Sequence, residues 1–458
     1  IMLTVEKIGG TSMSALAEVI DNIICYNRTA DQLGNRVFVV SAFSGVTNRL
    51  LENKKTRAPG VYHKLANGED YHEAVAGMTA HLVELNHQYA HLGLDTKKAD
   101  EFIGAHIAKA LSYLESATTM LASGYLNEGI LLAAREILAS IGETHSGYVL
   151  ASILQQRGMP AKFIDLAGFD DRRPLTISER ISDAFKDVDL ENCICIATGY
   201  AKGTEGIMRE FDRGYSEVTF SKIAEILKPQ EAIIHKEYHL STADPALVGI
   251  ENVQPVGNTN YDIADQLADV GMEAIHPKAA KPLEMGGIHL RIKNTFEPGH
   301  PGTLITRDYI SKVKRVEVIT GTAQLLLIDI YDPRMTGNVG SDLQIMQLFY
   351  AHNISYTFKV TSANSITIVI WESDFKPELI DDLKLKFEKV TTEPVAMVCL
   401  LGTNMDQPGL LAKAATALAK AEINIISGGF ARGKVNIQFL VAREQFKNAI
   451  IALNKAVG

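Results

Sequence analysis

The order of strand and helix signals in the first third of the chain is the feature that most constrains the fold. Residues Thr4–Ile8 predict a strand, and a helical pattern follows near Ala15–Asn27. Arg36–Ser41 predicts a buried strand, with a turn of small residues at Ala42–Gly45 and a helix from about Val46. This order is typical of a mostly parallel sheet covered by helices on both faces. We therefore expect an α/β fold.

The loop after the first strand combines a lysine, two glycines and a hydroxyl group: Lys7, Gly9, Gly10 and Thr11. Glycines let the backbone approach a ligand closely, and the unpaired N–H groups at a helix start favour an anion such as phosphate. Lys7 adds a full positive charge. The pattern is neither a Walker A motif nor a dinucleotide fingerprint, and a Gly-Gly pair is also common in a simple tight turn. Both interpretations stay open at this point.

The remainder of the first 308 residues continues the alternation around a helical insertion at about residues 69–123. We expect one helix over Asn127–Ser140 and a second that starts at Ile141 and runs through Gln156. Strands are expected in three further places: Ala161–Asp165, Cys193–Thr198 and Ala232–Ile234. The histidines of the insertion lack a consistent ligand spacing, so they predict solvated helix faces, and no metal site is expected.

Composition excludes several classes of protein. A net charge of −9 over 458 residues argues against nucleic acid or an anionic membrane as the main partner. No apolar run approaches the length needed to span a bilayer. The four cysteines, Cys25, Cys193, Cys195 and Cys399, form neither a metal-spaced set nor a disulfide framework. Cys193 and Cys195 alternate on an expected strand, which favours buried core thiols, and we expect a reducing, cytoplasmic setting.

After about residue 308 the chain contains a duplicated pattern. The first copy predicts a strand at Leu325–Ile330, a helix at Gly340–His352, a strand at Ile366–Trp371 and a helix at Glu378–Phe387. The second copy predicts the same order at Val395–Leu401, Gly409–Ala421, Val435–Val441 and Glu444–Val457. A period of roughly 70 residues with this order indicates two ferredoxin-like βαββαβ modules. Such modules commonly pair through their sheets and bind small ligands.

Several polar side chains near expected strand ends could bind a substrate. Ser41 and Thr47 carry hydroxyls that suit a carboxylate, although the same residue types are standard helix caps. Glu143 follows a glycine at an expected helix start, where a carboxylate either stabilises the dipole or faces a substrate ammonium. Arg213 precedes a helix expected near Val218 and could hold a carboxylate through two parallel hydrogen bonds.

Taken in order, these motifs resemble those of aspartokinases, members of the amino acid kinase superfamily. The resemblance covers essentially the whole chain and rests on Lys7-Ile8-Gly9-Gly10-Thr11-Ser12, Ser41-Ala42, Ser44-Gly45-Val46-Thr47-Asn48, Gly142-Glu143, Arg213-Gly214-Tyr215-Ser216, Thr242-Ala243-Asp244-Pro245, His276-Pro277, Lys293-Asn294-Thr295-Phe296 and Pro301-Gly302-Thr303-Leu304. It implies a three-layer αβα amino acid kinase domain at residues 1–308, an ACT domain at 309–392 and a second at 393–458. The stretches around Lys7, Arg213 and Lys236 are similar to the specialised aspartokinases associated with ectoine biosynthesis.

The resemblance implies the reaction ATP + L-aspartate → ADP + 4-phospho-L-aspartate, the first step of aspartate-family amino acid biosynthesis. The aspartate carboxylate is ionised at neutral pH, so the chemistry needs charge neutralisation and positioning rather than a general base. The implied catalytic residues are Lys7, Glu143 and Arg213. The implied aspartate-binding residues are Ser41, Thr47, Glu143, Arg213 and Ser216. The implied nucleotide-binding residues are Lys7, Gly9, Gly10, Thr11, His235 and Lys236. Mg²⁺ would arrive with ATP, held mainly by phosphates and water.

The nucleotide side departs most from the family pattern. His235-Lys236 stands where most aspartokinases have Thr-Asp, and three further usual contacts are replaced by Ser241, Ala246 and Glu273. These changes suggest either a rearranged ATP site, with Lys236 supplying positive charge, or a weakened kinase. Two alternatives therefore stay open: a catalytically silent amino-acid sensor with ACT domains, and a kinase for another amino acid.

Regulation and assembly are also implied only by the resemblance. An amino-acid effector could bind at the ACT domains, where the turn Met335–Ser341 precedes a helix suited to a carboxylate. Thr357 stands where lysine-sensitive relatives carry an acidic residue, so we predict only weak inhibition by lysine alone. A homodimer or larger homo-oligomer is expected.

Overall fold

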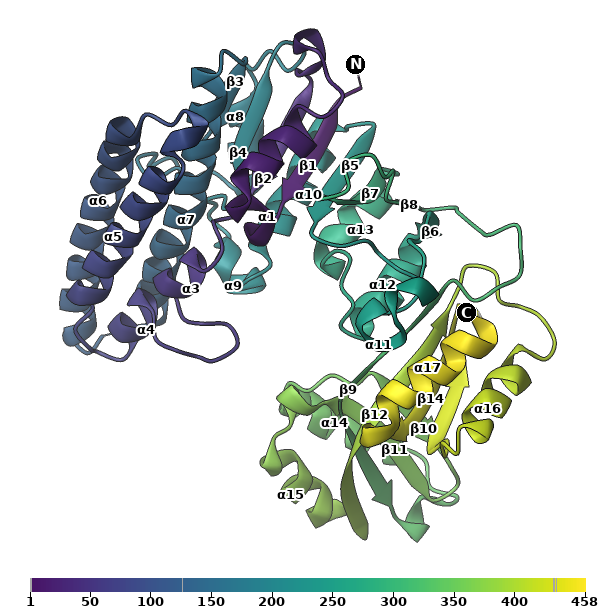
Figure 1. The fold of residues 1–458 in the computed structure, drawn as a ribbon. Helices are drawn as coiled ribbons and strands as arrows, with labels where there is room; N and C mark the ends of the chain where they lie inside the picture. Colours follow the sequence, from purple (N-terminus) through teal and green to yellow (C-terminus); the bar gives the residue numbers. More distant parts are fainter. Residues whose placement is uncertain (1, 126, 431–432, 434) are drawn as a thin grey trace. The chain divides into compact units, whose positions relative to one another are not determined.

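The chain forms two compact units in a computed structural model (Figure 1). The structure describes residues 2–125, 127–430, 433 and 435–458. The amino-terminal unit comprises the chain up to His239 together with Ile275–Arg307, and the carboxy-terminal unit comprises Leu240–Ala274 and Asp308–Gly458. Among the described helices, none combines the length and the apolar character needed to cross a bilayer.

The amino-terminal unit is built on a mostly parallel sheet, as predicted. Its strands are β1 (Thr4–Ile8), β2 (Arg36–Val40), β3 (Ala161–Ile164), β4 (Ile194–Thr198), β5 (Glu231–Lys236), β7 (His289–Asn294) and β8 (Thr303–Thr306). Within this unit the order is β3-β4-β2-β1-β5-β7-β8, and only the pairing of β7 with β8 is antiparallel. Every residue of β2 and β4 is buried, which explains why both read as continuous apolar runs.

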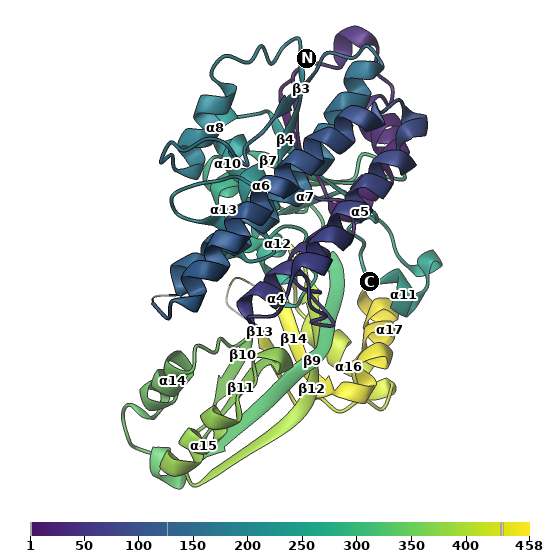
Figure 2. The same cartoon turned by 90° about the vertical axis from the view of Figure 1, so that its left-hand side faces the viewer.

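Helices cover both faces of this sheet and produce the predicted three layers. On one side α7 (Glu128–Gln156) packs against β2, β3 and β4, and outside it lie α6 (Thr96–Ala122) and α5 (His72–Gln88). The opposite side carries α8 (Ile177–Phe185), α10 (Tyr215–Leu227) and α13 (Pro277–Met285) (Figure 2). The predicted helical insertion is confirmed by α5 and α6.

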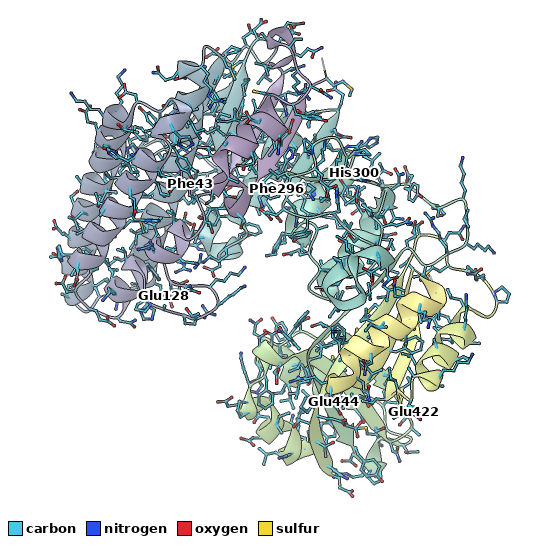
Figure 3. All side chains as sticks on the ribbon, viewed as in Figure 1. Phe43, Glu128, Phe296, His300, Glu422 and Glu444 are labelled. Atoms are coloured by element: carbon cyan, nitrogen blue, oxygen red, sulfur yellow. The ribbon has the colours of Figure 1, made fainter. Side chains whose placement is uncertain are left out.

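Short helical segments connect these elements: α1 (Gly10–Ser14), α2 (Leu16–Glu18), the π-helical η1 (Val19–Ile24), η2 (Ala30–Gln32), α3 (Val46–Leu50), α4 (Val61–Ala66), η3 (Ala90–Leu92) and α9 (Ile207–Phe211). The helix expected over residues 15–27 is wrong in its bounds, because helical structure starts at Gly10 and is interrupted at Ala15, which leaves the helical conformation. Phe43, in the turn after β2, packs against Tyr89 and His145 and fixes that turn to the helical layer (Figure 3).

The predicted break at residues 140–141 is also wrong, since α7 runs without interruption from Glu128 to Gln156. Gly142 does not end a helix. A Cβ at Gly142 would lie 2.8 Å from the Cβ of Ala42, so the glycine lets α7 pack closely on the turn after β2. Glu143 therefore lies in the middle of a buried helix, and the argument from a helix-start dipole does not apply to it.

The carboxy-terminal unit contains one antiparallel sheet of six strands in the order β10-β11-β9-β12-β14-β13. The strands are β9 (Val318–Tyr331), β10 (Phe358–Thr361), β11 (Ser365–Trp371), β12 (Lys389–Leu401), β13 (Ser427–Phe430) and β14 (Asn436–Ala442). The helices are α14 (Ser341–Ala351), α15 (Pro377–Lys386), α16 (Leu410–Lys420) and α17 (Phe446–Val457), with short turns η5 (Pro333–Met335), η6 (Glu372–Asp374) and η7 (Arg443–Gln445). The predicted duplication of a βαββαβ module is confirmed.

The two modules share their central strands. β9 pairs with β11 along Leu325–Tyr331, whereas its earlier residues pair only with β12. β12 in turn pairs with β14 along Val395–Leu401. Each of the two long strands therefore runs through both modules. The start of β9 contributes to the core of the second module, and the start of β12 contributes to the core of the first.

The segment before residue 275 also belongs to the carboxy-terminal unit. It contains α11 (Pro245–Val248), η4 (Ile250–Asn252), β6 (Asn258–Asn260) and α12 (Tyr261–Asp269). Ile263 and Leu267 of α12 pack with Leu325 and Cys399 of the sheet in one buried cluster. The predicted domain boundaries at residues 308/309 and 392/393 stay a prediction.

Candidate active site

The candidate site lies at the carboxyl end of β1, where four predicted or neighbouring polar side chains meet. The Lys7 ammonium on β1 lies 3.3 Å from Oε1 of Glu217, in the first turn of α10. Ser216, the preceding residue of α10, donates its hydroxyl to Oε1 of Glu143 at 2.5 Å. Because α7 and α10 pack on opposite sides of the sheet, the cluster is formed where both layers reach its edge.

Glu143 is a buried carboxylate with an incomplete set of partners. Its side chain is 2% exposed, and among the described residues its Oε2 atom has no hydrogen-bond partner. Burial raises the pKa of Glu143 to about 8, and the Ser216 hydroxyl and the Lys7 charge only partly counter this effect. A buried anion in this state gains most from a cation that donates hydrogen bonds to it. The predicted grouping of Lys7, Glu143 and Ser216 is therefore present in the fold.

Arg213 precedes α10 and is fixed to the segment after β2. Its guanidinium donates to Oδ1 of Asn48 at 3.3 and 3.2 Å and to the backbone oxygen of Glu52. Thr47, beside Asn48, contacts the buried phenol of Tyr215. Ser41 lies at the end of β2, and its backbone oxygen accepts the Ser146 hydroxyl of α7 at 2.8 Å. Thr47 and Arg213 thus lie on segments that contact each other directly.

The two glycines of the first loop differ in their surroundings. A Cβ at Gly10 would lie 2.8 Å from the backbone oxygen of Ala42, so this glycine is needed for close backbone packing. A Cβ at Gly9 would have no described atom within 4 Å, so its backbone faces open space. Thr11, in the short helix α1, is exposed. Gly9 and Thr11 are thus open to a ligand, and Gly10 is partly exposed.

His235 and Lys236 lie on opposite faces of the sheet. The register of β5 on β1 pairs Ile234 with Lys7, so Lys236 shares the face of Lys7, and His235 points the other way. His235 is buried, with Nε2 2.6 Å from Oε2 of Glu6. The structure does not bring His235 to Lys7, because adjacent strand residues alternate in direction.

Glu217 is the site residue that sequence reasoning missed. Burial pushes the pKa of Glu217 upward, but Lys7, the backbone N–H of His276 and Lys236 outweigh it, so the pKa lies below its ordinary value. The His276 N–H donates to Oε2 of Glu217 at 2.6 Å. The available signal was its position one residue after Ser216 at the start of α10.

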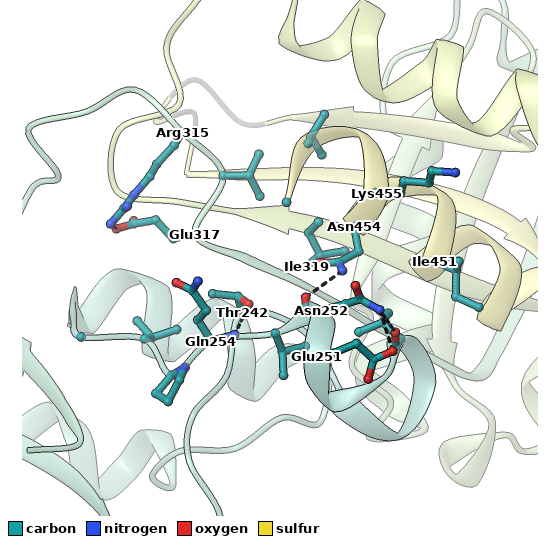
Figure 4. A pocket seen from close by; sticks show the side chains of 18 of the residues that line it. Thr242, Glu251, Asn252, Gln254, Arg315, Glu317, Ile319, Ile451, Asn454 and Lys455 are labelled. Atoms are coloured by element: carbon teal, nitrogen blue, oxygen red, sulfur yellow. Dashed lines mark hydrogen bonds and ion pairs between the residues drawn. The ribbon is translucent and has the colours of Figure 1, made fainter. Parts of the chain in front are cut away.

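Neither unit offers a protein metal cluster: across the described ranges, no three His, Cys, Asp or Glu side chains are arranged to hold a metal ion. The carboxy-terminal unit contains a separate cavity of about 850 Å³ beside the end of α17 (Figure 4). Asn454 of α17, one of the residues that line it, donates to the backbone oxygen of Asn252 at 3.1 Å. The turn Met335–Ser341, predicted to suit an effector, does not line this cavity, and its role stays a prediction.

Comparison with known proteins gives a consistent family for the whole chain. The amino acid kinase family matches residues 2–294, and an ACT domain matches residues 398–457. The chain is 42% identical to the aspartate kinase Ask_Ect of Stutzerimonas stutzeri, over all of this chain and 97% of that protein. It is 26% identical to the chloroplastic aspartokinase 1 of Arabidopsis thaliana, over 99% of this chain and 79% of that one.

Solved structures show the same fold. The aspartate kinase of Clostridium acetobutylicum superposes with a TM-score of 0.75 at 22% identity, with both chains fully covered. Aspartokinase III of E. coli, in complex with aspartate and ADP, superposes with a TM-score of 0.74 at 18% identity over 99% of each chain.

Proposed function

This chain belongs to the amino acid kinase family and, within it, to the aspartokinases, and we propose that it phosphorylates L-aspartate. The γ-phosphoryl group of ATP would move to the β-carboxylate oxygen, giving ADP and 4-phospho-L-aspartate. The observation that carries this proposal is the group of Lys7, Glu143 and Ser216 at the end of β1, with Arg213 three residues before Ser216. Glu143 offers a buried oxygen without a partner among the described residues, which suits the ammonium of aspartate, and Arg213 offers a guanidinium for its α-carboxylate.

In this proposal the ammonium and the α-carboxylate of aspartate each have a charged partner. The ammonium donates to Oε2 of Glu143, and the α-carboxylate is held by Arg213, with hydroxyls of Ser41, Thr47 and Ser216 nearby. Binding the ammonium restores the ionised form of Glu143, because a cation lowers the pKa of a buried carboxyl. The β-carboxylate is already ionised in water, so no general base is needed.

Lys7 is proposed to stabilise the transferring phosphoryl group. An ammonium carries three N–H donors, so Lys7 can keep its contact with Glu217 while it donates to a phosphate oxygen. Glu217 is a positioning residue here, because it is itself held by the His276 N–H. Preorganised positive charge of this kind lowers the cost of the charge that develops in phosphoryl transfer.

The nucleotide is proposed to bind over Gly9, Gly10 and Thr11, with Lys236 supplying charge on the same face as Lys7. Mg²⁺ accompanies ATP and is held by phosphate oxygens and water, since magnesium retains several waters in such sites. The predicted contact of His235 with the nucleotide requires a rearrangement, because His235 is bound to Glu6.

The product is proposed to enter aspartate-family amino acid biosynthesis, and the similarity to Ask_Ect supports a dedicated role in ectoine synthesis. A homodimeric or larger assembly, an amino-acid effector at the ACT domains and a cytoplasmic location complete the proposal. The four free thiols are compatible with a reducing compartment.

An ATP-dependent hydroxamate assay with aspartate, glutamate and N-acetylglutamate tests the proposal. We expect product with aspartate alone, and a loss of at least about 100-fold in kcat for Lys7→Met, because one preorganised charge is removed. Lys162→Met, an exposed lysine on β3 of the same sheet, is the matched control and should retain activity. Turnover with another amino acid would reassign the substrate, and no turnover with any would favour the amino-acid sensor.

A further inference from the structure

The face of the central sheet opposite Lys7 carries charged side chains where such sheets are usually apolar. Four neighbouring strands contribute to it: Arg36 from β2, Glu6 from β1, His235 from β5, and Arg291 and Lys293 from β7. Buried faces of parallel sheets are normally filled by aliphatic residues. A charged stripe across four strands therefore calls for a functional explanation.

Two ion pairs account for part of this charge. Arg36 donates to Glu6 at 2.9 and 3.3 Å, and its remaining N–H groups reach the backbone oxygens of Ile23 and Ile24 at 2.8 Å. Arg291 donates to both oxygens of Glu231, at 2.9 and 2.8 Å. Both carboxylates of the stripe are thereby occupied.

Arg28 and Lys293 are two further cations that take part in neither of these ion pairs. Among the described residues, the hydrogen-bond acceptors of both are backbone oxygens: Gln32 for Arg28 and Pro298 for Lys293, each at 3.3 Å. Burial lowers the pKa of Lys293, which means that its charge is not fully compensated, whereas Arg28 is exposed and its charge faces solvent. His235 adds no charge, because burial lowers its pKa as well. With Glu231 of β5 and Arg28, which lies in the loop before η2, the group contains four cations and two carboxylates and has a net charge of +2.

An open space lies against these cations. A cavity of about 220 Å³ is lined by Arg28, Arg36, His235 and Lys293, by the amides of Asn22 and Asn294, and by the carboxylate of Glu6, which is paired with Arg36. A second cavity of about 460 Å³ adjoins it, shares Arg28 and Lys293, and adds Arg291 with its paired Glu231. The first is large enough for a tetrahedral oxyanion, and the second for a small organic group attached to it. Amide and guanidinium donors are the groups that bind phosphate oxygens well.

We propose that this pair of cavities binds a phosphate dianion, either inorganic phosphate or a small phosphate monoester, at a site separate from the Lys7 site. The anion would sit between Arg28 and Lys293 and balance their charge. β1 and β5 carry the two sites on opposite faces, since Glu6 alternates with Lys7 and His235 with Lys236. The site is thus distinct from the candidate active site and does not depend on the proposed kinase activity.

Titration calorimetry on the full chain tests this site, with inorganic phosphate and glycerol 3-phosphate as separate probes at constant ionic strength. We expect the affinity for phosphate to fall about tenfold in Lys293→Met and in Arg28→Gln, because each removes one charged hydrogen bond. Lys293→Arg should retain binding. Lys162→Met, the exposed lysine on β3, is the matched control and should bind as the unaltered chain does.

Lys7→Met separates the two sites, because it removes the cation of the candidate active site only. Unchanged phosphate binding in Lys7→Met supports the proposal, and loss in that variant alone would assign the phosphate to the active site and overturn it. Equal heat with chloride at the same ionic strength would also overturn it. Arg28 is exposed, so Arg28→Gln gives a valid result even if Lys293→Met folds poorly. Tighter binding of glycerol 3-phosphate than of phosphate would identify a monoester as the ligand.

Discussion

The aspartate half and the nucleotide half of the candidate active site are built differently. In the aspartate half, Glu143 binds Ser216 and Arg213 binds Asn48, so the side chains are held by one another. In the nucleotide half, Gly9 faces open space and Thr11 is exposed. The proposed aspartate half is therefore preorganised, whereas the Gly9–Thr11 part of the proposed nucleotide half is open to solvent.

Two glutamates near Lys7 show this difference directly. Glu143 and Glu217 both flank Lys7, yet burial raises the pKa of Glu143 to about 8, while the pKa of Glu217 lies below its ordinary value. Glu217 lies 3.3 Å from the Lys7 ammonium and accepts a backbone N–H, whereas Glu143 has one oxygen without a partner among the described residues. Glu217 already holds a cation, and Glu143 is ready to accept one.

The largest expected effect comes from removing the charge of Glu143. Glu143→Gln leaves the substrate ammonium without its counter-charge. Breaking a buried ion pair costs about 3–5 kcal/mol, so kcat/KM for aspartate should fall roughly 1000-fold. Steady-state kinetics with aspartate varied at saturating ATP measure this. Glu136→Gln, on the same helix but facing a different cavity, is the control. A loss below tenfold, or an equal loss in the control, would remove the ammonium role.

Arg213→Lys is expected to have the next largest effect. Lysine keeps the charge but not the planar fork that can hold a carboxylate by two hydrogen bonds and remain fixed to Asn48. KM for aspartate should rise roughly 30-fold, with a smaller change in kcat. Arg173→Lys, an exposed arginine paired with Asp171 and Asp183, is the matched control. If KM for ATP rose instead, Arg213 would belong to the nucleotide half.

Much of the fold could be predicted because its signals are local. The apolar runs of β2 and β4 and the repeated order of the ACT modules are visible in single segments of the chain. The uninterrupted course of α7 was missed because the reason for Gly142 is a contact with Ala42, a hundred residues earlier. The sharing of β9 and β12 between modules likewise depends on strand pairing across the repeat.

Contacts between residues far apart in the sequence were also missed in the candidate site. Motif order alone selected Lys7, Glu143 and Ser216, which the fold does bring together. It could not show that Glu217 binds Lys7, because 210 residues separate them. The position of His235 was closer to being predictable: once β5 is extended through Lys236, alternation places the two side chains on opposite faces.

The pH dependence of KM for aspartate tests the raised pKa of Glu143. Aspartate needs the ionised carboxylate, so KM for aspartate should be roughly tenfold higher at pH 7 than at pH 9, given a pKa of about 8. Kinetics across this range should show the change in the unaltered chain. A flat KM profile would mean that Glu143 is ionised throughout.

The contribution of Glu143 to the free energy of unfolding should change with pH in the direction opposite to that of a salt-bridged carboxylate. Between about pH 4.5 and 8 the folded state keeps a proton on Glu143 that the unfolded state releases, so the free energy of unfolding falls as pH rises through this window. Glu143→Gln should remove that part of the slope. Thermal unfolding of both chains at several pH values measures the difference, and identical slopes would contradict the assignment.

The smallest expected effect concerns Lys236, which belongs to the proposed nucleotide half of the site. Lys236 shares the face of Lys7 and contributes to the lowered pKa of Glu217, so it lies near the place proposed for the phosphates. A single cation at a partly exposed site contributes about 1 kcal/mol or less, so Lys236→Gln should raise KM for ATP about threefold and leave KM for aspartate unchanged. Lys162→Gln is the matched control. An unchanged KM for ATP would leave the loop at Lys7–Thr11 as the main phosphate contact, and a changed KM for aspartate would place Lys236 between the two halves.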